Sequence, residues 1–310
     1  MEDNRTSANA ATKTMQIIPL PCYLNGQFSD LARAQVSVMD RGFIFGDGIY
    51  EVVPAYGGRP FRFAQHMARL ERSLQEVRIP NPLSREGWLA IVQKLIDQYA
   101  QSVGASSDST DQLVYMQITR GVAMRDHTML SGLQPTVFIT TNLMTPPSTE
   151  QRAGGVTCVS AEDFRWEKAH IKSTSLLGAV FARQISADVD AAETVMFRRG
   201  FLSEAAASNV WVVKGGAVIG PPKDHLVLEG IRYGLIEELC QASAIRFELR
   251  RITRDEVFDA DELLLSSATK EVLPITKLDQ QAVGHGPLQG RPGPVYEKLY
   301  AAYQRAKASP

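Results

Sequence analysis

The sequence predicts a fold of the α+β (mixed α/β) class, in two lobes, and three observations support that prediction. The chain has 310 residues, about twice the length of a usual single domain. Hydrophobic residues make up 44% of the chain and charged residues 22%, which is typical of a folded globular protein. In the first half, helical and strand-like stretches occupy separate blocks instead of alternating, as expected for α+β architecture.

The domain organisation follows from where the periodic patterns stop. The stretch TPPSTEQRAGG, residues 145–155, is dense in Pro, Ser, Thr and Gly, and we expect it to be the linker between the lobes. Residues 19–144 then form a small α+β domain and residues 156–310 a larger domain. We expect residues 1–18 to be a disordered tail, because they lack the apolar centre of a secretory signal and any strong periodicity.

Two glycine turns organise the expected first lobe. Asn25-Gly26 is a strong hairpin signal between strand-like residues, and Gly57-Gly58 joins two further β-rich runs. HMARLERSLQEV follows with helical spacing, and Ser84 is a plausible cap for a second helix, SREGWLAIVQKLIDQYA. QLVYMQITRG and TVFITTNLM return to strand character.

The second lobe is expected to begin with a strand, VTCVSAEDFRW, and a helix, STSLLGAVFARQISADV. A meander of strands follows, with turns at Arg199-Gly200 and Gly215-Gly216. We expect a helix that opens at Gly230, then the strand and small-residue loop of ELLLSSATKEVLPIT, and a closing helix in VYEKLYAAYQRAK.

Composition and charge exclude several classes of protein. Lys and Arg number 33 against 34 Asp and Glu, so there is no excess of cations for a nucleic acid or an anionic membrane surface. No apolar run is long enough to span a bilayer. The three cysteines lack any C-x-x-C spacing, which predicts reduced thiols in a cytoplasmic protein; they are Cys22, Cys158 and Cys240.

Metal and nucleotide sites are not predicted either. The five histidines show no i,i+4 pairing and no clustering with carboxylates in sequence. Gly46-Asp47-Gly48 begins like a dinucleotide loop but lacks the third glycine and leads into a strand.

Two isolated charged residues are the leading candidates for catalysis. Lys172 precedes a small-residue, apolar helix start, where desolvation favours the neutral, nucleophilic amine. The alternative is that Lys172 extends its amine to solvent. Glu204 is flanked by Ala and Ser, which suggests close packing of the backbone against something planar. The alternative is a structural strand carboxylate with satisfied hydrogen bonds.

Two further segments could bind anions. LEGIRYG resembles a phosphate-binding turn, because free backbone N–H groups follow its glycine. Arg125-Asp126-His127 places two side chains that can carry a positive charge two residues apart, as capture of a carboxylate requires. A solvated loop would have the same sequence.

Taken together, these segments resemble the fold-type IV pyridoxal-phosphate aminotransferases, and within them most closely the D-amino-acid (D-alanine) aminotransferases. The matching segments occur in the family's order between Tyr23 and Ile275; they are DRGFIFGDGIYEVV, HMARLERSL, YMQITRG followed by MRDH, DFRWEKAHIKSTSLLGAVFA, LSEAAASNVW, LEGIRYGLI and SSATKEVLPIT.

The resemblance implies a fold, a cofactor and a reaction. It implies a small N-terminal α+β lobe, a larger C-terminal lobe with a barrel-like β-sheet, and a homodimer. The cofactor is pyridoxal 5′-phosphate. The reaction is ping-pong transfer of an amino group from a D-amino acid, such as D-alanine, to a 2-oxo acid, either 2-oxoglutarate or pyruvate.

The resemblance also assigns roles to individual residues. Lys172 matches the lysine that binds the cofactor covalently and moves the substrate proton, and Glu204 matches the carboxylate that faces the pyridine nitrogen. The positions that match binding groups for the cofactor phosphate are Arg69, the helix-start amides of Ile231 and Arg232, and Ala268 with Thr269. Tyr50, Arg125 and His127 match the groups that capture the substrate carboxylate in the D-amino-acid branch.

This chain departs from the family pattern at three places. Ala205, Ala206 and Ala207 replace residues that are often Gly or Ser, Arg232 stands where threonine is frequent, and Ala268 lacks a hydroxyl. Each change could cost one cofactor contact, about 1 kcal/mol.

Other functions remain open within the same resemblance. They are 4-amino-4-deoxychorismate lyase, branched-chain L-amino-acid or (R)-amine aminotransferase, and a non-catalytic protein that binds the cofactor. A generic α+β dimer with no such activity remains if the resemblance is a coincidence.

Overall fold

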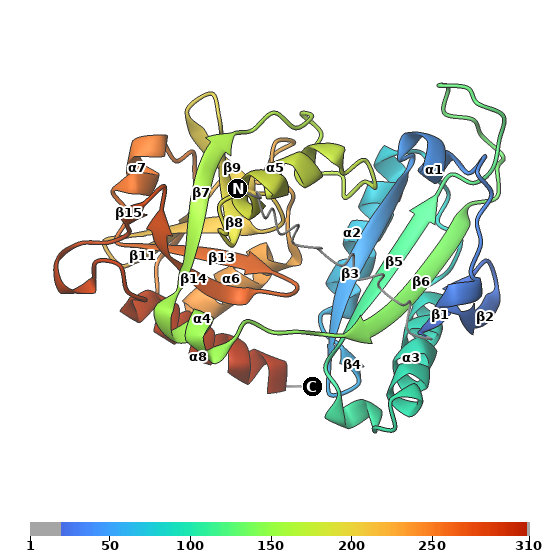
Figure 1. The fold of residues 1–310 in the computed structure, drawn as a ribbon, viewed down its shortest axis with the longest axis horizontal. Coiled ribbons are helices and arrows are strands. Elements are labelled where there is room, and N and C mark those ends of the chain that lie inside the picture. The colour runs from blue at the N-terminus through green and yellow to red at the C-terminus, as the bar shows by residue number, and fades with distance from the viewer. Residues whose placement is uncertain (1–19, 309–310) are drawn as a thin grey trace, which may run out of the picture.

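The computed structural model describes residues 20–308, and its strands form two separate sheets (Figure 1). The tail expected at residues 1–18 lies outside the described residues. Within residues 20–308, no helix is long and apolar enough to cross a membrane. The division into domains at residues 145–155 stays a prediction, although each sheet lies wholly on one side of that segment.

The first sheet has six strands in the order β2-β1-β6-β5-β3-β4, and every neighbouring pair is antiparallel. Its strands are β1 (Pro21–Leu24), β2 (Gln27–Asp30), β3 (Gly48–Tyr56), β4 (Arg59–Pro60), β5 (Gln112–Thr119) and β6 (Thr136–Leu143). The helices of this part are α1 (Arg41–Phe45), α2 (Phe63–Glu76) and α3 (Arg85–Ser102), with short 3₁₀ helices at Leu31–Arg33 and Ser107–Ser109.

The local signals of the first sheet are confirmed. Asn25 and Gly26 have positive φ angles of 47° and 96° between β1 and β2, as the tightest hairpin turns require. Gly57 and Gly58 make the turn between β3 and β4. The hydroxyl of Ser84 accepts from the backbone N–H of Gly87 and caps α3, as expected.

The two faces of the first sheet have different environments because strand side chains alternate. Ile49 and Val53 of β3 are fully buried against α2 and α3, in a core that includes Leu70 and Trp88. Tyr50 points to the opposite, half-open face, which carries further aromatic rings. The sheet therefore has one packed face and one face available for function.

The second sheet has nine strands. They are β7 (Val156–Glu162), β8 (Glu193–Arg198), β9 (Phe201–Ala205), β10 (Asn209–Lys214), β11 (Ala217–Gly220), β12 (Phe247–Leu249), β13 (Glu262–Ser267), β14 (Glu271–Leu278) and β15 (Gln281–Ala282). The order is β12-β11-β10-β13-β14-β7-β8-β9, with β15 paired to β14, and the pairs β11–β12, β14–β7 and β7–β8 are parallel.

The helices of this part are α4 (Thr149–Gly154), α5 (Leu177–Ala187), α6 (Ile231–Ala242), α7 (Arg254–Phe258) and α8 (Pro294–Ala308), with a 3₁₀ helix at Gly286–Leu288. Helices α6 and α8 pack on one face of the sheet, around Trp211 and Leu264. The opposite face holds a second core, to which Ile252 and Val257 contribute.

The second sheet is strongly curled. Strands β9 and β10 are five positions apart in the strand order, which in a flat sheet corresponds to about 24 Å. Yet Ala205, the last residue of β9, donates its backbone N–H to the carbonyl of Ser208 over 2.8 Å, directly before β10 begins. The sheet must therefore bend into the half-barrel visible in Figure 1.

A segment of the second half completes the first sheet. At residues 48–50 strand β3 has a free edge, because β4 pairs only with its far end. The backbone N–H of Tyr50 donates to the carbonyl of Lys172 over 2.9 Å, and the N–H of Thr174 donates to the carbonyl of Gly48 over 3.0 Å. Residues 172–174 thus pair with this edge and fasten the two halves together.

The structure corrects some expected boundaries. Helix α5 begins at Leu177, later than the sequence pattern predicted, because residues 172–174 are in extended pairing with β3. The expected linker contains α4, which begins with a capping box of Ser148 and Gln151. Helix α7 and strand β12 were not predicted, since elements of five and three residues are too short to show a period.

Two adjacent glycines provide a test of the backbone after α4. Gly155 has φ of 73° and ψ of −177°, and a Cβ there would lie 2.3 Å from the methyl group of Thr276. Gly155→Ala is therefore expected to lower the free energy of unfolding by about 2–4 kcal/mol, measured by urea denaturation. Gly154→Ala is the matched control, because a Cβ at Gly154 meets nothing within 4 Å and we expect no loss of stability. Equal stability of the two variants would contradict the prediction.

Candidate active site

Lys172 lies where the two halves meet, against the open face of the first sheet. Its backbone pairs with Tyr50 as described above, and its N–H also approaches the Ser73 hydroxyl of α2 at 3.4 Å. The Nζ atom lies 4.0 Å from the centroid of the Tyr50 ring, a cation–π geometry for the protonated amine. Lys172 is half-buried, whereas the sequence suggested a desolvated lysine.

The Gly46-Asp47-Gly48 turn positions the Lys172 segment. Thr174 and Ser175 both donate their hydroxyls to the carbonyl of Gly46, over 2.8 and 3.0 Å. A Cβ at Gly46 would lie 2.8 Å from the Ser175 hydroxyl, and a Cβ at Gly48 would lie 2.6 Å from the carbonyl of Ile118. Glycine is needed at both positions for close backbone approach.

Glu204 lies on β9 and is buried in a dense polar network. Arg165 Nη1 lies 2.9 Å from one of its carboxylate oxygens. The other oxygen accepts from the side chain of Asn209 over 3.2 Å and from the backbone N–H of Leu228 over 3.3 Å. Arg165 is itself held by both oxygens of Asp163, at 3.0 Å each.

Burial controls the protonation of Glu204. Removal from water raises its pKa to about 7, and the nearby Asp163 adds to the rise, while the attraction of Arg165 opposes it. Burial disfavours the charge of Arg165, but its two carboxylate neighbours outweigh that effect and raise its pKa above the ordinary value, so the guanidinium stays charged. A positive group placed beside Glu204 would therefore favour its ionised form.

A second buried charge cluster lies on the helix side of β3. Arg69 of α2 donates from Nε and Nη2 to the two oxygens of Glu51, over 2.7 Å each, and His66 Nδ1 lies 2.8 Å from Glu51. Burial lowers the pKa of His66 to about 4, so the imidazole is neutral near pH 7 and donates from Nδ1. Arg69 is thus already paired with a carboxylate, and its remaining nitrogen Nη1 donates to the Glu229 carbonyl over 3.2 Å.

The N-terminus of α6 meets both networks. Its cap residue, Gly230, has no side-chain cap and lies so close to Asn209 that a Cβ would come within 2.2 Å of the amide oxygen. Arg69 reaches the preceding carbonyl, and Asn209 connects the same region to Glu204. Free N–H groups at a helix N-terminus attract anions.

The turn after β13 lies beside this helix start. Ser266 pairs with Asn209 across β13 and β10, and the turn that contains Ala268 and Thr269 begins one residue later. Both turn residues are half-buried. The hydroxyl of Ser267 accepts from the backbone N–H of Lys270 over 3.0 Å and closes the turn. Arg69 and Asn209 thus contact the segment that precedes α6, and the phosphate-binding role of the expected positions stays a prediction.

The expected substrate-binding trio is not assembled within one chain. Tyr50 stacks near Tyr115, with ring centroids 5.8 Å apart, on the open face of the first sheet. Arg125 and His127 are exposed on the loop between β5 and β6, and both contact the ring of Phe45 instead. Among residues 20–308 neither is joined to Tyr50 by a hydrogen bond or a ring contact.

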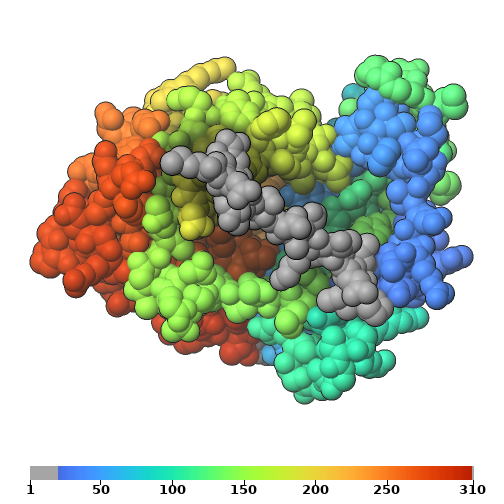
Figure 2. Space-filling view, in the orientation of Figure 1, coloured from blue at the N-terminus to red at the C-terminus, as the bar shows by residue number. Residues whose placement is uncertain are grey.

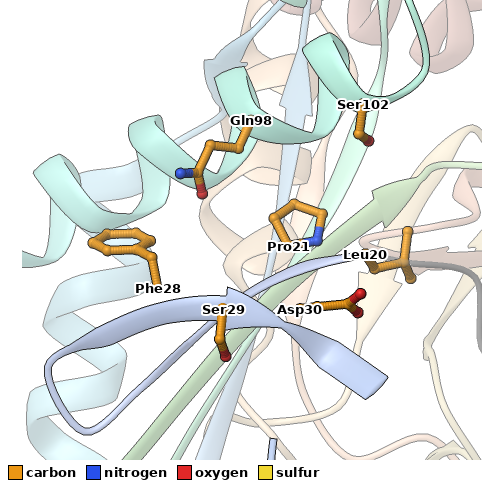
Figure 3. Close-up of a pocket in the computed structure, with 7 residues that line it drawn as sticks. All are labelled: Leu20, Pro21, Phe28, Ser29, Asp30, Gln98 and Ser102. Carbon is orange, nitrogen blue, oxygen red and sulfur yellow. The ribbon is translucent and has the colours of Figure 1, made fainter. Parts of the chain in front are cut away.

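The surface cavities lie away from these groups. One hollow of about 270 Å³ lies between the β1–β2 hairpin and α3; Figure 3 shows its lining residues, Leu20, Pro21, Phe28, Ser29, Asp30, Gln98 and Ser102. Its only carboxylate, Asp30, accepts from the backbone of Ala32, so the hollow contains no evident catalytic group. Another cavity of about 470 Å³ opens where β3, β4, α6 and α8 meet. Figure 2 shows the hollowed surface between the two halves.

The sequence analysis missed several residues of these networks. They are Asp163 and Arg165 beside Glu204, Asn209 between Glu204 and α6, and Glu51 with His66 beside Arg69. The sequence analysis considered the segments that contain them, but pairs such as Arg165 with Glu204 and Arg69 with Glu51 join positions far apart in the chain. The one local signal was that Asp163 and Arg165, with opposite charges, lie two residues apart in the sequence.

The chain can be assigned to a known protein family. The model of the family described as amino-transferase class IV matches residues 48–278. The chain therefore belongs to the class IV aminotransferases, and it has their fold type, with a small antiparallel sheet followed by a curled half-barrel sheet.

Individual relatives agree with this assignment. The chain is 34% identical to the D-alanine aminotransferase of Bacillus licheniformis over 282 residues, 91% of this chain and 95% of that protein. It is 32% identical to the D-alanine aminotransferase of Staphylococcus aureus (strain COL) over 284 residues, 91% of this chain and 96% of that protein. The structure of the branched-chain amino acid aminotransferase from Escherichia coli has a TM-score of 0.78 at 20% identity and covers 93% of this chain and 94% of its own.

The raised pKa of Glu204 predicts a pH dependence of stability. Because the pKa in the folded protein, about 7, lies above the ordinary 4.5, stabilisation by protonated Glu204 is complete below about pH 4.5 and is lost as the pH rises through 7. The cofactor-free protein should therefore lose unfolding free energy relative to Glu204→Gln between about pH 5 and 8, by about 1.4 kcal/mol per unit of pKa difference. Urea denaturation across this range measures it, and parallel pH profiles would contradict it.

Proposed function

We propose that this class IV aminotransferase uses pyridoxal 5′-phosphate to transfer an amino group from a D-amino acid, such as D-alanine, to 2-oxoglutarate or pyruvate. The observation that carries the proposal is the placement of the half-buried Lys172 amine against Tyr50, at the junction that also contains the Glu204 network and the start of α6. D-alanine aminotransferases at 34% and 32% identity support the choice of substrate class.

The residues of this chain fit the proposed cofactor. Lys172 offers an amine beside Tyr50 for covalent attachment, and the start of α6 with Arg69 and the turn at Thr269 offers donors for a phosphate. Glu204 offers a carboxylate for a pyridine nitrogen. When bound, the cofactor would supply an electron sink for the bonds at the substrate Cα.

The proposed roles follow from the chemistry of these groups. With the cofactor bound, the Lys172 amine would take the proton from the substrate Cα and hold it for its return. Glu204 would supply a carboxylate to the pyridine nitrogen and favour the protonated form of that nitrogen. Arg165 and Asn209 are proposed to orient the carboxylate, since both contact it directly.

Recognition of the substrate carboxylate is proposed for Tyr50, Arg125 and His127. Because one chain does not join Arg125 and His127 to Tyr50, either movement of their loop or a second copy of the chain has to bring them together. The Arg125 guanidinium and the His127 imidazole can both donate hydrogen bonds to a carboxylate, and Tyr50 lies beside Lys172.

A homodimer is proposed as well. Helix α5 and the segments on either side of it expose large apolar side chains that a single chain leaves in water; they are Phe164, Trp166, Leu177, Val180, Phe181, Ile185 and Val189. A cluster of this kind is typical of an interaction surface. The expected cytoplasmic location remains a prediction.

Covalent attachment at Lys172 is the direct test of the cofactor. Reduction of the purified protein with borohydride, followed by peptide mass spectrometry, should place a pyridoxyl group on Lys172. Lys172→Ala should lose the adduct and at least about a thousandfold in activity, because it removes the amine proposed to bind the cofactor and to move the proton. Lys172→Arg controls for charge and should also lack the adduct. An adduct on another residue would refute the assignment.

Enantiomer preference is the direct test of the reaction. A coupled assay that offers D-alanine and L-amino acids with 2-oxoglutarate should give turnover with the D-enantiomer. Arg125→Ala and His127→Ala should each raise the KM for D-alanine about tenfold or more, because each removes a charged partner of the carboxylate. Arg199→Ala, an exposed arginine elsewhere, is the control.

Three other outcomes would redirect the proposal. Turnover of branched-chain L-amino acids would favour an L-aminotransferase, and turnover of amines that lack a carboxylate would favour an (R)-amine aminotransferase. Release of pyruvate from 4-amino-4-deoxychorismate without D-alanine turnover would favour the lyase.

A further inference from the structure

Arg41, the first residue of α1, is a buried arginine that contacts the loop proposed to bind the substrate carboxylate. The residue is 3% exposed. Its Nη1 donates to the backbone carbonyl of Asp126 over 2.5 Å, and its Nε donates to the carboxylate of Asp47 over 2.7 Å. Because Asp126 stands between Arg125 and His127, this one side chain holds the centre of the segment that carries both.

The last residue of α1 contacts the two side chains themselves. The centroid of the Phe45 ring lies 5.4 Å from the guanidinium carbon of Arg125 and 5.3 Å from the centroid of the His127 ring. The guanidinium carbon of Arg41 lies 4.8 Å from the same centroid. Phe45 therefore keeps Arg125 and His127 beside one ring, while Arg41 holds the backbone between them.

The chain at the start of α1 also pairs with the beginning of the loop. Asp40 forms an antiparallel β-bridge with Val122. A Cβ at Gly42 would lie 2.3 Å from the methyl group of Thr119, so α1 packs directly on the end of β5. The loop is thus fastened to α1 where it leaves β5 and again at Asp126.

Asp47 fixes Arg41 to the core of the first half. Its carboxylate also accepts from Nε and Nη2 of Arg120, over 2.7 and 3.0 Å. Arg120 is buried and donates to the carbonyls of Val77 and Arg78, directly after α2, over 2.6 and 3.1 Å. Burial alone would raise the pKa of Asp47, but the two guanidinium groups outweigh burial and lower that pKa below its ordinary value. The carboxylate is therefore ionised at neutral pH and binds both arginines.

The turn that contains Asp47 also holds the Lys172 segment. The carbonyl of Gly46 accepts from the hydroxyls of Thr174 and Ser175, so the lysine segment and the loop share one anchor. Binding groups act best when they are held within about 0.5 Å of the productive geometry. A loop that is ordered in advance also loses less conformational freedom when its ligand binds.

We propose that Arg41, held by Asp47, is a positioning residue for substrate recognition: it orders the loop so that Arg125 and His127 meet the substrate carboxylate together. This inference deepens the proposed function and rests on it, because it assumes that those two residues bind the carboxylate. Loss of Arg41 should therefore weaken the binding of amino acids and spare amines that lack a carboxylate.

The test compares D-alanine with D-alaninol, which has the same amine but no carboxylate, in single-turnover reactions of the enzyme loaded with pyridoxal 5′-phosphate. Arg41→Gln should raise the half-saturating concentration of D-alanine about fivefold to twentyfold and leave the limiting rate within about threefold. The second-order rate constant for D-alaninol and the Kd of pyridoxal 5′-phosphate should stay within about twofold. A general loss of structure would change all of these quantities.

Arg41→Lys is the gentler variant if Arg41→Gln does not fold. It keeps a charge beside Asp47, but an ammonium cannot replace the two-sided guanidinium, so the half-saturating concentration should rise about threefold. In an Arg125→Ala background, Arg41→Gln should cause a smaller increase than in the wild type, because one of the positioned groups is gone. Arg62→Gln is the matched control, since Arg62 donates to both oxygens of Glu238 over 2.7 Å each and takes no part in these contacts. It should react with both compounds as the wild type does.

The outcomes separate this inference from the proposed function. Unchanged half-saturation by D-alanine in Arg41→Gln, in an enzyme that Arg125→Ala does weaken, would overturn the role of Arg41. Equal losses with D-alanine and D-alaninol would overturn it too. A wild type that does not turn over D-alanine, or an Arg125→Ala variant that binds D-alanine as well as the wild type, would overturn the proposed function itself.

Discussion

The pairing of residues 172–174 with the free edge of β3 is the interaction on which the rest of the site depends. It fastens the half-barrel to the first sheet, and it sets Lys172 beside Tyr50 by backbone hydrogen bonds alone. Because strand pairing fixes which residue faces which side, a slip of one residue would turn the lysine away from Tyr50. The glycines of the turn before β3 allow this close approach of the two backbones. Residues without a reactive side chain therefore help to hold Lys172 in place.

The second constraint is a continuous polar network that joins Glu204 to the start of α6. Glu204 is bound by Asn209 and by the Leu228 backbone, and Asn209 also packs against Gly230 at the start of α6. A shift of the helix would therefore displace the carboxylate proposed for the pyridine nitrogen together with the donors proposed for the phosphate. Such a network needs most of its members to be present, because a buried carboxylate left with fewer partners is strongly destabilising.

The sequence predicted the elements better than the contacts between them. Turns such as Asn25-Gly26 and caps such as Ser84 were predictable because their physical cause lies within four residues. The start of α5 was not, because the residues before it obey pairing with a strand more than a hundred positions away. The partners of Glu204 and Arg69 could not be predicted either, because Arg165 and Glu51 come beside them only after the chain folds. Resemblance to a family supplied candidate positions, but it could not show that Arg69 already has a carboxylate partner.

These features distinguish the groups proposed for the cofactor from the groups proposed for the substrate. Glu204 and Arg69, both proposed for the cofactor, are held by hydrogen bonds within one chain, whereas Arg125 and His127 stand exposed on a loop beside Phe45. One chain therefore positions these two groups by itself, while the proposed substrate side has to be assembled from a loop or from a second copy. It follows that changes on the open side should alter which acid is chosen without altering the bond that is broken. Changes in the Glu204 network should do the reverse.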